Sequence, residues 1–177
     1  MSATDVVPTP ASGMRPRAAI YGGAYGLSIM LGLFGSPAVM PISLTTIVTL
    51  GGALAAYLLA SKLDPVRGRR NILAVAGWGA GYGSVVGMAT VLVIFLHEIP
   101  TGLAFGAMFG APLGALAGLA AGAGLSVLAR IGQASSKGTA FIRWLLFGML
   151  SGGIIGFLLL PALGFLLNLY FPHFGVD

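Results

Sequence analysis

The sequence predicts an all-α, polytopic integral membrane protein, folded as a five-helix transmembrane bundle. Two observations carry this prediction: 57% of the 177 residues are hydrophobic while only 7% are charged, and the charged residues gather between long uncharged stretches. A soluble domain is about 25% charged on average. The chain also has no cysteine, so it offers neither a disulfide nor a thiol nucleophile. This composition excludes a soluble enzyme, a disordered chain and a disulfide-stabilised scaffold.

The first two predicted spans come from residues 18–61, which include no charged residue. A bilayer core of about 30 Å is crossed by about 20 apolar residues in a helix, so this stretch is long enough for two crossings. Pro37 and Pro41 interrupt helical hydrogen bonding between them. We expect one span over residues 18–36 and another over 42–61. Because the first is short, a re-entrant segment is an alternative interpretation of it.

The third predicted span covers residues 72–96, with Asn71 as its N-cap. The segment 97–101 contains a proline and predicts a tight turn. This turn leads into a fourth span over residues 102–129, which is again long enough to cross the bilayer.

The fifth predicted span covers residues 144–167 and follows a polar loop over residues 130–143. The spans and their connections form a single transmembrane bundle over residues 18–167. Residues 1–17, rich in proline and small polar residues, predict a flexible N-terminal cytoplasmic tail. Residues 168–177 predict a short outer C-terminal tail.

The basic residues all fall on one side of the predicted membrane. They are Arg15, Arg17, Lys62, Arg67, Arg69, Arg70, Arg130, Lys137 and Arg143. The positive-inside rule then places the N-terminus in the cytoplasm and the C-terminus outside. We expect a multi-pass protein of the bacterial inner (cytoplasmic) membrane. The positive charge is spread over three membrane-bounded segments, which does not favour nucleic-acid binding.

The most basic connection, between the second and third spans, is expected to fix the topology. Its four cations are also expected to contact anionic lipid head groups or a cytoplasmic partner. They are Lys62, Arg67, Arg69 and Arg70.

Glycine recurs at every fourth residue in three of the spans, a small-xxx-small (glycine zipper) pattern that lets helix backbones approach closely in lipid. We interpret these glycines as sites of helix packing, within the bundle or in docking onto another protein. They are Gly79, Gly83 and Gly87 in the third span, Gly102, Gly106, Gly110, Gly114, Gly118 and Gly122 in the fourth, and Gly148, Gly152 and Gly156 in the fifth.

Two consequences follow from the geometry of a regular α-helix. Six glycines spaced four residues apart drift about 200° around the helix. The fourth span should therefore have different neighbours at its two ends, or cross its neighbour at a steep angle, with Pro112 as a hinge near its middle. In the third span, Gly77 and Gly81 form a second stripe on the opposite side from Gly79, which predicts close contacts on both sides.

The sequence offers little chemistry inside the membrane. No span carries a charged side chain at depth, as proton- and ion-coupled transporters normally do, and no serine or threonine has a partner base within its span. We therefore expect no enzyme activity and no metal. His97 and His173 lie on the outer side and are candidate metal or pigment ligands, although ordinary interfacial roles are the simpler interpretation. Tyr21, Tyr25, Trp78 and Tyr82 are expected to pack helices or to line a groove for lipid, quinone or carotenoid.

These observations favour a non-catalytic accessory or structural subunit of a larger membrane protein complex, for example a respiratory or photosynthetic one. Its expected partners are other membrane subunits and membrane lipids, with bound lipid the expected ligand. The alternative is a small channel or transporter for a neutral or apolar solute, which could act as a homo-oligomer. A pore or polar cavity would favour transport, whereas a filled bundle with exposed glycine grooves would favour the subunit.

Overall fold

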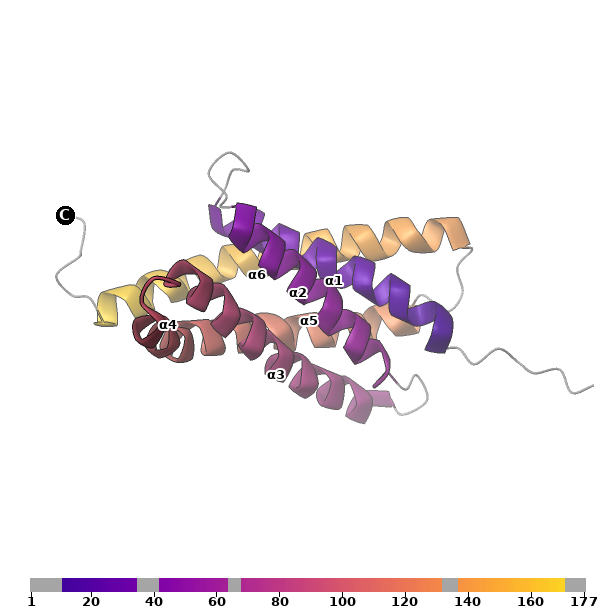
Figure 1. The fold of residues 1–177 in the computed structure, drawn as a ribbon. Coiled ribbons are helices and arrows are strands. Elements are labelled where there is room, and N and C mark those ends of the chain that lie inside the picture. Colours follow the sequence, from indigo (N-terminus) through magenta and orange to yellow (C-terminus); the bar gives the residue numbers. More distant parts are fainter. Residues whose placement is uncertain (1–10, 35–41, 64–67, 132–136, 171–177) are drawn as a thin grey trace, which may run out of the picture.

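The computed structural model describes residues 11–34, 42–63, 68–131 and 137–170, and these are helical almost throughout. Because α4, η2 and α5 continue into one another without a break, the described chain forms five helical rods (Figure 1). This confirms the all-α fold. The elements are α1 (Ala11–Phe34), α2 (Ile42–Ala60), α3 (Gly68–Ile94), α4 (Ile99–Phe105), the π-helix η2 (Gly106–Gly110), α5 (Ala111–Ile131) and α6 (Lys137–Tyr170).

Four of the rods are long and apolar enough to cross a membrane: α2, α3, the continuous α4–η2–α5 helix, and α6. They confirm a multi-pass integral membrane protein. Helix α1, with 24 residues, has sufficient length, but Arg15 and Arg17 lie within it, and Tyr21, Tyr25 and Ser28 add polar groups to its uncharged part. Those three residues are buried within the bundle.

The helices form two closely packed groups. Helix α1 lies between α2 and α6, while α3 packs along α5 (Figure 1). Helix α1 runs antiparallel to α2 and parallel to α6, and α3 runs antiparallel to α5. As a result α1, α3 and α6 begin at the end of the bundle where α2 and α5 finish. The basic residues of the described segments therefore gather at one end.

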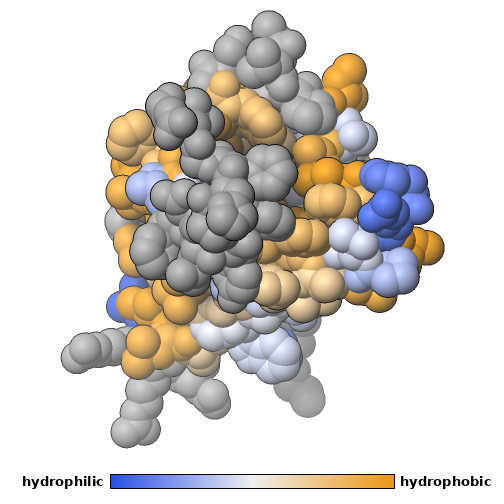
Figure 2. Space-filling view, turned by 90° about the vertical axis from the view of Figure 1, so that its left-hand side faces the viewer, coloured by the Kyte–Doolittle hydropathy of each residue, from blue (hydrophilic) through white to orange (hydrophobic). Residues whose placement is uncertain are grey.

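The opposite end of the bundle is different in character. Figure 2 views that end and shows mainly apolar side chains among the described residues, with a hydrophilic group at one edge. The basic residues thus mark one end of the rods rather than their lateral faces.

The backbones of α3 and α5 are in direct contact along what we call the α3–α5 seam. Gly79 faces Gly118, Gly83 faces Gly114, and Gly87 faces Gly110. A Cβ atom at any of these six positions would collide with the backbone of the other helix. The absence of side chains is what permits this approach.

All six glycines of the fourth span lie against α3 or the residue that follows it, so the expectation of different neighbours at its two ends is wrong. The alternative, a steep crossing of the neighbouring helix, stays a prediction. Beyond the seam, Gly102 lies against Leu92 and Phe95, Gly106 against Met88, and Gly122 against Val75 and Ala76. Segment η2 offsets part of the drift of the regular helix. A π-turn contains more residues than an α-turn, so four residues complete less of a circle there.

Several expected boundaries prove wrong because helices continue beyond their apolar part. Helix α1 begins at Ala11, so the tail expected over residues 1–17 is helical from that residue onward. Asn71 lies within the first turn of α3 rather than at its N-cap, since α3 begins at Gly68. Hydropathy marks where a chain contacts lipid, not where helical hydrogen bonding stops.

The polar connections are shorter than expected for the same reason. Helix α5 extends to Ile131 and α6 already begins at Lys137, within the loop expected over residues 130–143. Helix α4 begins at Ile99, inside the expected turn, with Pro100 in its first turn. Proline is well accommodated there because the first N–H groups of a helix have no partner within it. The expected break at Pro37 and Pro41 lies outside the described residues.

The α3–α5 seam gives a matched pair of substitutions on one helix. A Cβ atom at Gly83 would meet the backbone of α5, whereas a Cβ atom at Gly81 would have nothing within 4 Å. We expect Gly83→Leu to lower the free energy of unfolding by at least about 3 kcal/mol, because backbone cannot move aside as a side chain can. Gly114→Leu should act likewise. Gly81→Leu should leave stability unchanged or slightly higher, since glycine is a poor helix former.

The measurement is reversible unfolding of each variant in mixed micelles. Equal stability of Gly83→Leu and Gly81→Leu would contradict the close packing of α3 on α5.

Candidate functional site

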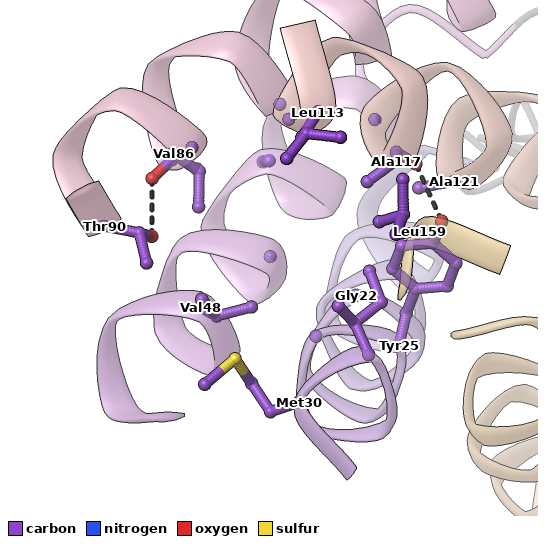
Figure 3. A pocket seen from close by; sticks show the side chains of 18 of the residues that line it. Gly22, Tyr25, Met30, Val48, Val86, Thr90, Leu113, Ala117, Ala121 and Leu159 are labelled. Carbon is purple, nitrogen blue, oxygen red and sulfur yellow. Dashed lines mark hydrogen bonds between the residues drawn. The ribbon is translucent and has the colours of Figure 1, made fainter. Parts of the chain in front are cut away.

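The bundle encloses a cavity of about 300 Å³ between the α1–α2 pair and the α3–α5 pair. All five rods contribute to its wall, with Leu159 coming from α6. Figure 3 shows Met30, Val48, Val86 and Leu113 around this space, each from a different helix. The cavity is therefore a product of the whole bundle rather than of one helix pair.

The cavity exists because its walls are built from glycine and alanine. The six glycines of the α3–α5 seam line one side. On the other side, α1 and α2 pack through Gly22, Gly26 and Gly52, where added Cβ atoms would again meet backbone. Glycine thus brings each pair together and leaves no side chain to fill the space between the pairs.

Three hydroxyl groups lie on the cavity wall, and each donates a hydrogen bond to a backbone carbonyl. Tyr21 donates to Ala121 O at 3.2 Å, and Tyr25 donates to Ala117 O at 2.7 Å. These two bonds connect α1 to α5 across the cavity. The hydroxyl of Thr90 donates to Val86 O in its own helix at 2.7 Å (Figure 3).

Because no charged side chain lines the cavity among the described residues, their wall presents hydrocarbon and already-bonded hydroxyls. Such a wall suits an apolar molecule. It provides no general acid or base and no activated nucleophile.

The two ends of the cavity differ in exposure. At one end Tyr21 and Leu125 are completely buried, and Leu59 is 2% exposed. At the other end Phe34 is 39% and Ile94 is 50% exposed. Among the described residues, the cavity wall is therefore buried at the basic end of the bundle and partly exposed at the opposite end, which we call its open end.

The closed end is formed by an aromatic cluster around Tyr21. Its ring lies 5.9 Å from that of Tyr25, 6.2 Å from Phe147 and 6.5 Å from Trp144, measured between centroids. Aromatic pairs at such distances add stability beyond the area that they bury. This cluster joins α1 to α6 beneath the cavity.

Helix α6 is held against α1 by the predicted glycines of the fifth span. Gly148 lies against the backbone of Tyr21, Gly152 against that of Tyr25, and Gly156 against that of Ile29. Ser28 also donates a hydrogen bond to Met149 O at 2.5 Å. The twelve glycines predicted for packing or docking thus all lie at contacts inside this chain.

The second stripe on α3 has no such contact. No atom lies within 4 Å of an added Cβ at Gly77 or Gly81, and both residues are exposed. The expectation of close contacts on both sides of this helix is therefore wrong within the chain. The spacing of Gly77 and Gly81 was visible in the sequence, but nothing there distinguished it from the spacing of Gly79 and Gly83.

The predicted hinge at Pro112 lies in the first turn of α5, directly after η2. The N–H of Ala111 donates to Gly106 O, five residues back. Proline has no N–H and its ring crowds the carbonyl four residues earlier. The π-helix lies directly before this proline, and a hinge at Pro112 itself stays a prediction.

Two cations at the basic end lie over aromatic rings. Lys62 Nζ is 5.2 Å from the ring centroid of Trp78, and the guanidinium of Arg15 is 5.6 Å from that of Tyr57. Lys62 thus contacts its own chain, at one of the four positions predicted for lipid or partner contact. Of the other three, Arg69 and Arg70 lie in the first turn of α3 and Arg67 lies outside the described residues.

The histidines are not brought together in the described part of the chain. His97 lies in the exposed turn after α3, whereas His173 lies outside the described residues. Those residues contain no group of three or more His, Cys, Asp or Glu side chains that could hold a metal ion. Trp78 and Tyr82 stack on each other at 6.3 Å, away from the cavity.

Comparison with known proteins found no matching family model, no matching curated protein and no matching solved structure. The functional argument therefore depends on the residues and geometry of this chain.

The tyrosine hydroxyls that cross the cavity provide a second test. Tyr25→Phe should lower the free energy of unfolding by about 0.6 to 1.7 kcal/mol, the range for hydrogen bonds between membrane helices. Thr90→Val is the control, because it removes a hydroxyl from the same cavity that bonds only within α3. Unfolding in mixed micelles measures both. A loss in Thr90→Val as large as that in Tyr25→Phe would show that the bond from α1 to α5 has no special role.

Proposed function

We propose that this protein is a non-catalytic subunit of a larger membrane protein complex, docking through the exposed glycine face of α3. The observation that carries the proposal is the open space at Gly77 and Gly81. Helices in lipid are not driven together by the hydrophobic effect, so small residues that permit close backbone approach mark sites of association.

The surroundings of these glycines have the shape of a helix-docking site. Along the same stripe, Leu73 is 67% and Val85 is 66% exposed. The two glycines form a notch between these larger side chains, four residues from each. The other glycine stripes are covered by this chain's own helices, so this face is the one where the pattern has no partner within the described bundle.

The chemistry of the bundle supports a structural role. The cavity wall offers no acid, base or nucleophile, and its hydroxyl hydrogens are donated to carbonyls. A subunit that positions helices needs none of these groups. The expected partners are membrane helices that carry small residues of their own, together with the lipids that surround the bundle.

The proposal includes the topology. We infer five crossings of a bacterial inner membrane, with the basic end of the bundle in the cytoplasm. Helix α1 supports the fifth crossing because it lies alongside α2 and α6. The glycine contacts between these helices follow the small-xxx-small pattern of membrane helix pairs.

Transport of an apolar solute is the second candidate, and the cavity favours it. Against it stands the closed end, where Tyr21 and Leu125 are completely buried. A transport pathway would have to open through the aromatic cluster.

The docking face gives a specific prediction. Gly77→Leu and Gly81→Leu should fold normally but abolish association with the partner, because leucine side chains fill the notch. The tagged protein is gently solubilised from its native membrane, sized, and its companions are identified and quantified by mass spectrometry. Gly164→Leu is the matched control, since that glycine on α6 is also exposed with open space around it.

Co-migration of the wild type and Gly164→Leu in a complex of fixed stoichiometry, lost in the two α3 variants, is the expected result. Migration of the wild type alone or as a small homo-oligomer would overturn the subunit proposal.

The topology can be tested directly because the chain has no cysteine of its own. Single cysteines are introduced as Gly13→Cys, Ile42→Cys and Glu98→Cys, all at exposed positions. In intact spheroplasts, a membrane-impermeant maleimide should label the second and third but not the first. Labelling of Gly13→Cys should require permeabilisation. If Gly13→Cys and Ile42→Cys behave alike, α1 does not cross the membrane.

A further inference from the structure

We propose that the cavity binds one acyl chain of a membrane phospholipid, which enters through the open end and extends toward the aromatic cluster. This inference concerns the interior of the bundle and is independent of the docking proposal. It would hold for a protein that has no partner subunit.

The length and width of the cavity suit a single extended chain. Its wall follows α1 from Tyr21 to Phe34, a distance of about 20 Å at 1.5 Å per residue. A volume of about 300 Å³ spread over that length leaves a narrow channel. Because half of a hydrocarbon core is about 15 Å thick, a chain that enters from one leaflet can reach the closed end.

The wall excludes other contents. A buried water molecule needs two to four polar partners, and the hydroxyl hydrogens on the wall are already donated within the protein (Figure 3). An ion or polar head group would find no charged side chain among the lining residues. An empty apolar space of this size forfeits dispersion contacts along its whole wall. A hydrocarbon chain restores those contacts without requiring any polar group.

The membrane supplies this occupant at the place where the cavity opens. Phe34 and Ile94 at the open end are partly exposed, at the end of membrane-crossing helices where lipid lies. Acyl chains are the most abundant hydrocarbon there, and mass action favours the abundant ligand when the site has no polar group to select a rarer one. The head group would then remain outside the bundle, at the end away from the basic residues.

Photo-crosslinking provides a spatial test. The purified protein is reconstituted into phosphatidylcholine vesicles in which one acyl chain carries a diazirine at its methyl end. After irradiation, labelled residues are mapped by mass spectrometry. We expect labelling of Tyr21, Tyr25 or Leu125, which bulk lipid does not reach because they are 0 to 5% exposed. Labelling of exposed side chains such as Leu54 and Leu150 reports ordinary lipid contact in every sample.

Two variants that fill the cavity should lose the deep labelling. Leu113→Trp places a larger side chain in the cavity from α5, and Val48→Phe does so from α2. The test stays informative as long as one of the two variants folds. Each has a control on its own helix at an exposed position: Leu116→Trp and Leu50→Phe, where the wild-type residues are 56% and 64% exposed. The controls should retain the deep labelling.

Deep labelling in the wild type and both controls, lost in both filled variants, is the result that supports an acyl chain. Labelling confined to exposed residues in the wild type would overturn the proposal. So would native mass spectrometry of protein taken directly from its membrane, if it showed a stoichiometric polyisoprenoid in place of phospholipid.

Discussion

The contact between the backbones of α3 and α5 is the constraint on which the rest of the bundle depends. Gly83 and Gly114 meet with no side chain between them, so the two helices are closer than any pair of alanine-bearing helices could be. This closeness stabilises the pair through dispersion and weak Cα–H···O contacts. It also removes side-chain volume from the inner face of the pair, and the same happens between α1 and α2 at Gly22 and Gly52. Two thin layers result, and the space between them is the cavity.

The irregular segment η2 keeps this contact continuous. A regular α-helix would carry a four-residue stripe gradually away from its neighbour, yet Gly102 and Gly122, at the two ends of the stripe, both face the α3 side. The π-turn over Gly106–Gly110 offsets part of that rotation. Pro112 makes the turn favourable by interrupting the regular hydrogen-bond pattern just beyond it. The π-turn, an irregularity in the helix, therefore contributes to its packing against α3.

Helix α1 has a different task, which is to connect the two layers. Its first turns carry Arg15 and Arg17, which make it the least apolar rod. It also carries the hydroxyls that reach other helices: Tyr21 and Tyr25 to α5, and Ser28 to α6. In a membrane these groups need protein partners. The bonds of Tyr21 and Tyr25 lie at the cavity wall, whereas the bond of Ser28 to α6 lies outside it. The aromatic cluster around Tyr21 makes the basic end solid, while the opposite end stays open. The proposed ligand and its direction of entry both follow from this asymmetry.

The sequence by itself determined the class of protein, the identity and approximate extent of the helices, and the end of the bundle that is basic. These properties are local or additive: a long apolar run must be helical in lipid, and charges must lie outside it. It also singled out twelve glycines that lie at close contacts within the chain, but not Gly32 or Gly52, which lie as close to a neighbouring backbone. Helix ends were less well predicted, as Ala11 and Asn71 show, because hydropathy does not report hydrogen bonding beyond the lipid.

Only the tertiary structure decided which glycine faces are covered and where the interior is empty. Gly77 with Gly81 and Gly79 with Gly83 have the same spacing in the same helix, yet the first pair is open and the second is sealed against α5. Spacing defines a face of a helix, but the neighbour that covers the face comes from distant segments. The cavity likewise exists because the helices within each pair lie closer together than the two pairs lie to each other. No local pattern encodes such a difference, because it depends on how closely every pair packs at once.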